Sequence, residues 1–247
     1  MGQQTRSQQT QNHRALIVIP AYNEEKTIAS VIYGLRQFAP EFDRVVVNDG
    51  ASDGTGEILA TLGETQLRLP CNVGYGYAVQ TGLKYALQHG YELVVTFDAD
   101  GQHRPEDVRG VVQALVDNNA DMVIGSRYSH GRRYSGPSER KWGQLLFSHL
   151  ARLLIGQRIY DTTSGLKAMR APVCRVIINS TFMDFHLETI VRLSMAGYKM
   201  VEYPITVQER THGRSMHSYL SVVAYPSQTL LLTLVATMDA LLARRQK

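Results

Sequence analysis

The chain has 247 residues, of which 44% are hydrophobic and 19% charged, so it can bury a substantial core and is not intrinsically disordered. Its two cysteines, Cys71 and Cys174, exclude a disulfide scaffold and a cysteine-based zinc site, and they suit a reducing compartment. The net charge of +4 is unevenly distributed: residues 1–124 carry 9 basic and 15 acidic side chains, residues 125–175 carry 10 and 2, and residues 176–247 carry 7 and 5. Such asymmetry often marks an anionic partner.

The two ends of the chain differ in character. Residues 1–13 are polar and lack the apolar segment of a secretory signal, which predicts a disordered tail. No uninterrupted apolar run reaches the roughly 18 residues that predict a bilayer-spanning helix. The nearest candidate, Tyr219–Ala243, is interrupted by Pro226 and Asp239.

Buried-strand patterns and one-sided helical patterns alternate over the first half of the chain. In chain order we predict a strand at Ala15–Pro20, a helix at Glu24–Phe38, a strand at Arg44–Asp49, a helix from Asp53 to about Leu62, a short strand at Gln66–Leu69, a helix at Gly76–Gln88, a strand at Glu92–Asp98, a helix from Pro105 and a strand at Asp121–Gly125. This alternation predicts an α/β fold with a mainly parallel, Rossmann-like sheet flanked by helices.

The pattern changes after residue 128. There we predict a loop at Ser129–Lys141, an amphipathic helix at Trp142–Ile155, a turn and strand at Asp161–Arg170, a helix at Asp184–Ala196, a strand at Met200–Val207, a basic loop at Glu209–His217 and a mostly apolar helix over 218–247.

The segment DADGQ at 98–102 places two carboxylates, Asp98 and Asp100, at the end of a predicted buried strand. Because side chains alternate along a strand, both carboxylates would face the same way. With the carboxamide of Gln102 they form a set of hard oxygen donors that suits Mg²⁺ or Mn²⁺. The alternative is a pair of solvated loop acids.

Polar segments also follow the first two strands. PAYNEE at 20–25 could be an ordinary turn before an acidic helix start, and NDGASDGT at 48–55 could be a glycine-rich turn and cap. In the functional alternative, an aspartate of the second segment accepts hydrogen bonds from a base or ribose. Since ligands of parallel sheets bind outside the carboxyl ends of the strands, we expect one site where these segments meet DADGQ.

These segments, in this order, resemble the family 2 glycosyltransferases, which have the GT-A fold. NVGYGYA at 72–78 also resembles a helix start of that family. Four further segments resemble the dolichyl-phosphate mannose synthases and related polyprenyl-phosphate glycosyltransferases: GSRY at 125–128, DTTSGLK at 161–167, EYPI at 202–205 and RTHGRS at 210–215. The resemblance covers almost the whole chain after the tail.

The resemblance implies a GT-A domain over 14–217, with a nucleotide-binding half at 14–127 and an acceptor half at 128–217, followed by an amphipathic helix at 218–247. It implies a nucleotide-sugar site formed by Pro20, Ala21, Tyr22, Glu24, Val47, Asp49, Asp98, Ala99, Asp100, Arg127, Arg210 and Arg214. The implied metal ligands are Asp98, Asp100 and Gln102, and the implied phosphate ligands include Arg127 and Arg210.

Two positions depart from the family pattern. Asn48 replaces the first aspartate of a D-D-G motif, so the role falls to Asp49. Met216 stands where the synthases have a lysine that contacts phosphate, and Arg214 is the candidate replacement.

The resemblance implies inversion of the anomeric centre by a single displacement. A hydroxyl acceptor then needs a general base, whereas a polyprenyl phosphate is already anionic. The candidate catalytic carboxylates, besides Asp98 and Asp100, are Asp161 and Glu188. Alternatively, Asp161 caps a turn and Glu188 pairs with Arg192 one helical turn later.

The excess of basic residues in 125–175 favours docking on anionic lipid headgroups or on a phosphorylated acceptor, because apolar residues lie beside it. The basic residues are Arg132, Arg133, Arg140, Lys141, Arg152 and Arg158, and the apolar ones include Trp142, Leu145, Leu146 and Phe147. Alternatively, the charges form a solvated face and the apolar residues bury one another or a dimer partner.

The sequence therefore predicts an inverting, metal-dependent glycosyltransferase that moves a sugar from a GDP- or UDP-sugar to a polyprenyl phosphate at the cytoplasmic face of a membrane. One alternative keeps the donor and uses a sugar hydroxyl of a lipid-linked glycan, which Met216 favours. Others are a non-catalytic binding protein, against which DADGQ argues, and a sugar-phosphate nucleotidyltransferase, for which a glycine-rich loop would replace PAYNEE. No nucleic-acid partner is expected, and a homo-oligomer or a separate membrane-anchored partner stays open.

Overall fold

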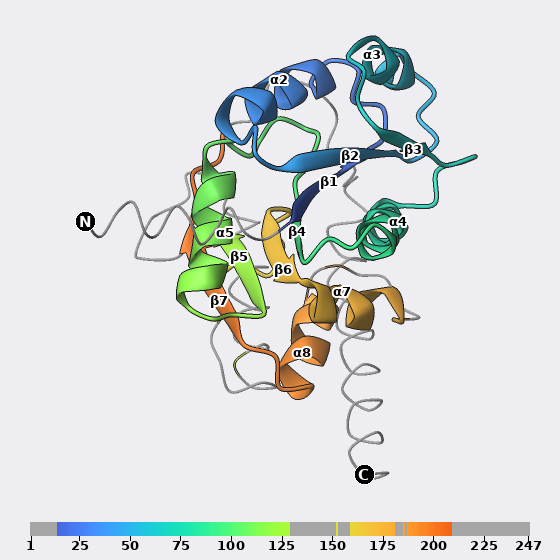
Figure 1. Cartoon of the computed structure of the whole chain (residues 1–247). Helices are drawn as coiled ribbons and strands as arrows, with labels where there is room; N and C mark the ends of the chain where they lie inside the picture. The colour runs from blue at the N-terminus through green and yellow to red at the C-terminus, as the bar shows by residue number, and fades with distance from the viewer. Residues whose placement is uncertain (1–13, 129–151, 153–158, 181–184, 186, 209–247) are drawn as a thin grey trace, which may run out of the picture.

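The computed structural model describes residues 14–128, 152, 159–180, 185 and 187–208 (Figure 1). The predicted tail, the loop at 129–141, nearly all of the helix at 142–155 and everything after residue 208 lie outside the described residues.

A seven-stranded sheet, in the order β3-β2-β1-β4-β6-β5-β7, forms the centre of the described structure. The strands are β1 (Ala15–Ala21), β2 (Asp43–Asn48), β3 (Gln66–Arg68), β4 (Leu93–Thr96), β5 (Met122–Ser126), β6 (Lys167–Arg170) and β7 (Met200–Pro204). The neighbours β1–β2, β1–β4, β2–β3 and β5–β7 are parallel, and β6 runs antiparallel to both β4 and β5. The prediction of a mainly parallel sheet is confirmed.

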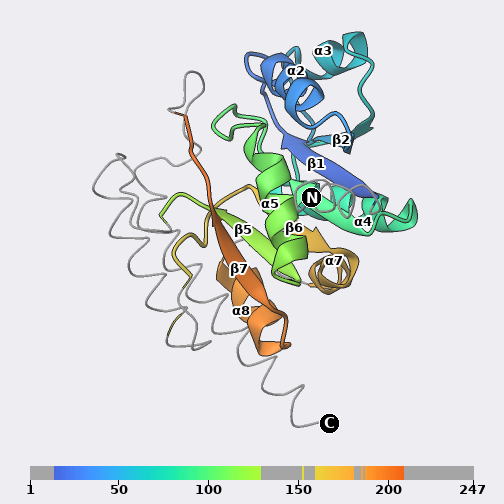
Figure 2. The same ribbon diagram turned by 60° about the vertical axis from the view of Figure 1, so that its left-hand side comes forward.

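Helices cover both faces of this sheet (Figures 1 and 2). They are α2 (Ile28–Phe38), α3 (Thr55–Thr61), α4 (Tyr75–Gln88), α5 (Asp107–Asp117), α7 (Ala171–Ile178) and α8 (Leu187–Met195). One buried cluster joins α2, α3 and α5 to the sheet, and a second joins α4, α7 and α8 to its other face. Within the described part of the chain, no helix is both long enough and apolar enough to cross a membrane.

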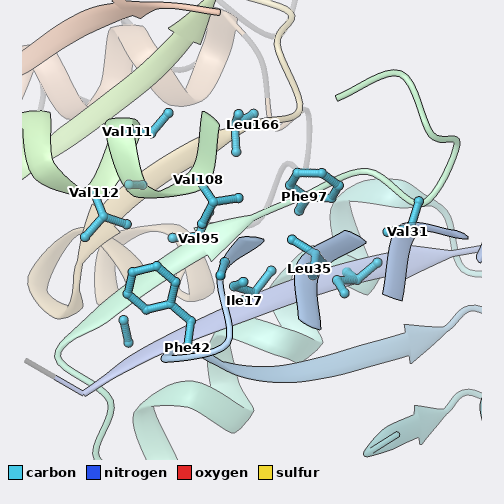
Figure 3. Close-up of a cluster of buried hydrophobic side chains, with 14 of the residues drawn as sticks. Ile17, Val31, Leu35, Phe42, Val95, Phe97, Val108, Val111, Val112 and Leu166 are labelled. Atoms are coloured by element: carbon cyan, nitrogen blue, oxygen red, sulfur yellow. The ribbon is translucent and has the colours of Figure 1, made fainter. Parts of the chain in front are cut away.

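The alternation of side chains along β1 produces the two clusters. Ile17 and Ile19 face the first, and Leu16 and Val18 face the second. Figure 3 shows how the first cluster is filled by side chains from α2, α5 and the strands between them, among them Val31, Leu35, Val95, Val108, Val111 and Val112. Burial of such side chains stabilises by roughly 1.5–3 kcal/mol each.

Gly82 determines how closely α4 packs against the sheet. A Cβ at Gly82 would lie 2.1 Å from Cγ1 of Val18, so the helix can approach β1 only because residue 82 has no side chain. The close approach fixes the position of α4, whose first residue, Tyr75, faces the carboxyl edge of the sheet.

Two predictions about helices are corrected. The helix expected from Glu24 begins at Ile28, because residues 24–27 form a turn in which the Glu24 carbonyl accepts from the amides of Thr27 and Ile28. The sequence analysis missed α7, which is only eight residues long and carries a proline in its first turn. Its apolar face is buried against α4 and β4, so tertiary packing supports a helix too short to stand out as a pattern.

Candidate active site

The segments that follow β1 and β2 are bound together at the carboxyl edge of the sheet. The amide of Ser52 donates to Oδ1 of Asn23 over 2.8 Å, and the amide of Glu24 donates to Oγ1 of Thr55 over 2.9 Å. Glu25 makes two further hydrogen bonds to the second segment: its amide donates to Asp53 Oδ2, and its Oε2 accepts from the Gly54 amide. The two polar motifs of the sequence therefore form one braced unit, as expected from a shared edge.

Asp49 holds the start of α4. Its carboxylate is buried and accepts from the amides of Val73 and Gly74 over 2.9 and 3.0 Å. Gly74, at φ +96, is the residue before α4, so a glycine suits this position. Asp49 therefore acts on the site through the loop at 72–74, a role that the sequence analysis did not foresee.

Three residues lie against the carboxylate of Asp98 just after the end of β4: Tyr75, His103 and Gly165. The Tyr75 hydroxyl donates to Oδ1 over 3.0 Å, and Nε2 of His103 lies 3.3 Å from Oδ2. A Cβ at Gly165 would lie 1.9 Å from Oδ2, so the loop before β6 closes on the carboxylate only because residue 165 is glycine. Burial alone would raise the pKa of Asp98, but His103, Tyr75 and the charge of Lys167 together hold it below its usual value.

Asp100 lies in the tight turn that follows. Its Oδ1 accepts from the amide of Gln102 over 3.0 Å, and Gly101 between them adopts φ +75. Both oxygens of Asp98 have partners in the protein, and Asp100 lies two residues further along the chain. Among the described residues no group of three or more His, Cys, Asp or Glu side chains could hold a metal by itself. The donors here still fit Mg²⁺ or Mn²⁺ completed by substrate phosphate oxygens.

Arg127 is held by Asp161 rather than extended alone. Its amide and Nε donate to Asp161 Oδ2, and its Nη2 donates to Asp161 Oδ1 and to Oγ1 of Thr163, all over 2.7–2.9 Å. The Asp161 side chain is completely buried. Burial alone would raise the pKa of Asp161, but the charge and hydrogen bonds of Arg127 lower it overall. Asp161 is therefore an anion in a structural ion pair.

The turn that carries Asp161 is itself anchored to β7. Glu202 accepts from the amides of Tyr160 and Asp161 over 2.9 and 2.8 Å. Burial raises the pKa of Glu202 above its usual value. Through these two hydrogen bonds, Glu202 of β7 holds the turn that carries Asp161 and so supports the ion pair between Asp161 and Arg127.

Glu188 follows the structural alternative as well. It is almost completely buried, and its Oε1 lies 3.4 Å from Nη2 of Arg192, one helical turn later in α8. Both candidate bases are therefore buried and paired with an arginine.

The remaining predicted residues divide into three groups. Tyr22 is 40% exposed at the end of β1 and can contact a ligand. The side chains of Ala21, Val47 and Ala99 are buried, Val47 within the second hydrophobic cluster, so a ligand could meet only their backbone. Pro20 is likewise buried in β1. Arg210, Arg214 and Met216 lie outside the described residues.

Sequence analysis missed a buried lysine beneath the site. Lys167 is completely buried at the start of β6, where Nζ donates to the carbonyls of Ser164 and Phe185 and lies 4.7 Å from the centroid of the Phe185 ring. Lys167 lies in DTTSGLK and His103 directly follows DADGQ, but the sequence analysis assigned no role to either residue. A lone lysine in a strand carries no signal of burial.

A cavity of about 310 Å³ lies at the other end of β1 and β2. Its lining contains Arg36 and Arg44, and both lie within 4 Å of Glu64. Asp43, also in the lining, accepts from the Tyr91 hydroxyl. Because its charges are matched internally, we place the site at the carboxyl edge instead.

Known proteins are similar to this chain in sequence and in fold. The profile of glycosyl transferase family 2 matches residues 16–178. The chain is 34% identical over 215 residues to an undecaprenyl-phosphate mannosyltransferase of Micrococcus luteus, covering 83% of this chain and 88% of that protein. It is 33% identical over 219 residues to a polyprenol monophosphomannose synthase of Mycolicibacterium smegmatis, covering 83% and 81%.

Among solved structures, the fold is similar to that of glucosyl-3-phosphoglycerate synthase from Mycobacterium tuberculosis, in a complex with Mn²⁺, uridine diphosphate and phosphoglyceric acid. The TM-score is 0.71 at 18% identity, and the match covers 94% of this chain and 81% of the other. At this identity the likeness concerns the fold alone.

Proposed function

We propose that this chain, which belongs to glycosyl transferase family 2, transfers a sugar from a nucleoside diphosphate donor to a polyprenyl phosphate, with inversion at the anomeric carbon. Family membership and the mixed α/β fold confirm the resemblance drawn from the sequence motifs. The chain is thus a glycosyltransferase, and the acceptor, the metal and the stereochemistry are the proposal.

The observation that carries the proposal is the state of the two candidate bases. Asp161 is buried against Arg127 and Glu188 is buried against Arg192. A hydroxyl acceptor needs a group that takes its proton, whereas a phosphate monoester is already anionic near neutral pH. Because the structure places both candidate carboxylates in ion pairs with arginines, their state favours a phosphate acceptor, which needs no base. The names of the two relatives, an undecaprenyl-phosphate mannosyltransferase and a polyprenol monophosphomannose synthase, support the same acceptor.

In the proposed reaction, a phosphate oxygen of the acceptor attacks the anomeric carbon of the donor. The bond from that carbon to the diphosphate oxygen breaks, and the nucleoside diphosphate leaves with the electron pair. Asp100 and Gln102 would hold a divalent cation, with Asp98 beside them. A cation bound there would neutralise the charge that develops on the leaving diphosphate.

Arg127 contributes a fixed positive charge on the acceptor side. Its position is set by Asp161, so little side-chain entropy is lost when an anion approaches. The basic sequence at 125–175, which begins just before it, supports docking at the cytoplasmic, anionic face of a membrane.

The test uses the purified full-length chain with UDP- and GDP-sugars, Mn²⁺ or Mg²⁺, and either a polyprenyl phosphate or the matching polyprenol. We expect nucleoside diphosphate release and a glycosylated lipid only with the phosphorylated form. Turnover with a lipid-linked glycan, and none with any polyprenyl phosphate, would favour the hydroxyl-acceptor alternative that Met216 suggests and would contradict the proposal.

A further inference from the structure

The Tyr75 hydroxyl bonds the carboxylate of Asp98, although the two residues lie on different elements and 23 positions apart. Tyr75 is the first residue of α4, and Asp98 follows β4. The bond joins the N-terminus of a helix to the turn that carries the acidic motif.

The Tyr75 hydroxyl is itself held in place. The loop before it is bound by Asp49, whose carboxylate accepts from Val73 and Gly74. The Tyr75 ring packs against Phe185 with centroids 6.5 Å apart, and Gly82 lets α4 rest directly on β1. The hydroxyl therefore points at Asp98 from a rigid support.

The partners of Asp98 decide how its carboxylate is turned. Tyr75 holds Oδ1, while His103 and the bare Cα of Gly165 lie at Oδ2. Because both oxygens are fixed, the carboxylate cannot rotate to follow a bound ligand. Asp100 lies two residues further along the same turn, so the orientation of one acid constrains the backbone that carries the other.

We propose that Tyr75 is a positioning residue of the donor site, which acts through Asp98 on the binding of the metal and diphosphate. This inference rests on the proposed function, because it needs a nucleoside diphosphate to bind at DADGQ. Tyr75 itself touches neither the donor nor the cation in this proposal.

The test compares Tyr75→Phe with Tyr77→Phe in the full chain. Tyr75→Phe removes only the hydroxyl and keeps the ring against Phe185. Tyr77 lies on the same helix, is 48% exposed and provides a matched control. Binding of UDP and of GDP is measured by calorimetry at several Mn²⁺ concentrations, and thermal unfolding is measured without ligand.

For Tyr75→Phe we expect nucleotide binding to weaken about tenfold, as for loss of a hydrogen bond to a charged group, and a rise in the Mn²⁺ concentration that gives half-saturation. The unfolding midpoint should fall by no more than the loss of one hydrogen bond explains, and Tyr77→Phe should bind like wild type. Unchanged binding and Mn²⁺ dependence in Tyr75→Phe would overturn the inference and leave the proposed function intact. A loss that came with a lower unfolding midpoint and an unchanged Mn²⁺ dependence would assign Tyr75 a purely structural role. If wild type binds neither nucleotide, the proposed function fails, and the inference fails with it.

Discussion

Arg127 donates three hydrogen bonds to Asp161, from its amide, its Nε and its Nη2. The side chain of Asp161 is fully buried, and the side chain of Arg127 is only 19% exposed. A bidentate pair of this kind fixes the geometry of the arginine as well as its charge. Arg127, which the sequence analysis predicted to bind phosphate, is therefore already held in position by Asp161 before a phosphate binds.

We first predict that Asp161→Asn destabilises the fold and lowers activity together. The change removes a buried anion and leaves the charge of Arg127 without its partner, which costs about 3–5 kcal/mol in free energy of unfolding. Urea unfolding measures the stability, and nucleoside diphosphate release measures the activity. Arg127→Met combined with Asp161→Leu should recover much of the stability but not the activity. A stable Asp161→Asn enzyme that loses only the acidic limb of its pH–rate profile would instead make Asp161 a base.

The same ion pair predicts how stability depends on pH. Because folding lowers the pKa of Asp161, the unfolded chain binds a proton more readily than the folded one. The stabilisation is fully present above the unfolded-state pKa of about 3.9 and is lost as the pH falls through the lower folded-state pKa. Asp98 contributes in the same sense.

Glu202 contributes in the opposite sense, because burial raises its pKa. The informative measurement is therefore the difference between wild type and Asp161→Asn in urea unfolding from pH 3 to pH 7. That difference should be large at pH 6 and should shrink as the pH falls below about 4. A difference that stayed constant across this range would mean that folding does not lower the pKa of Asp161, and one that shrank as the pH rose would mean that Asp161 is neutral in the folded chain.

Strand patterns could be predicted from sequence because buried strands are continuous apolar runs that end in polar residues. The expected strand at Ala15–Pro20 differs from β1 by one residue at its end, and the expected strand at Arg44–Asp49 is shifted from β2 by one residue. The motifs also located the edge at which Asn23, Asp49 and Asp98 gather. These successes rest on local pattern and on one rule about parallel sheets.

Apart from the Glu188–Arg192 pair, which lies one helical turn apart, the partners of the acids could not be predicted in the same way. Tyr75 reaches Asp98 because Gly82 allows α4 to pack closely against β1. No sequence pattern predicts the distance between a helix and the sheet on which it packs. Arg127 meets Asp161 across 34 positions of chain, through a turn that Glu202 anchors. A carboxylate in a motif can be a ligand, a base or a support, and three-dimensional contacts decide which.

We next predict that Asp100 contributes directly to binding of the cation. Asp100→Asn should weaken Mn²⁺-dependent binding of UDP or GDP by more than tenfold, because it removes a charged ligand from the proposed site. Calorimetry with and without Mn²⁺ measures the effect. Asp43→Asn is the control, since its side chain is 62% exposed at the opposite end of β2. Equal binding by Asp100→Asn and Asp43→Asn would remove Asp100 from the metal site.

Gly165→Ala provides a steric test of the same site. The added methyl group would lie 1.9 Å from Oδ2 of Asp98, so either the carboxylate turns away or the loop before β6 moves. The overpacking should cost about 1–3 kcal/mol in stability, and displacement of Asp98 should abolish Mn²⁺-dependent nucleotide binding. Ser164→Ala, one residue earlier and equally buried, adds no atoms and should bind like wild type. Full nucleotide affinity in Gly165→Ala, with Asp98 shown to be displaced in a structure of the variant, would mean that the orientation of Asp98 does not control the donor site.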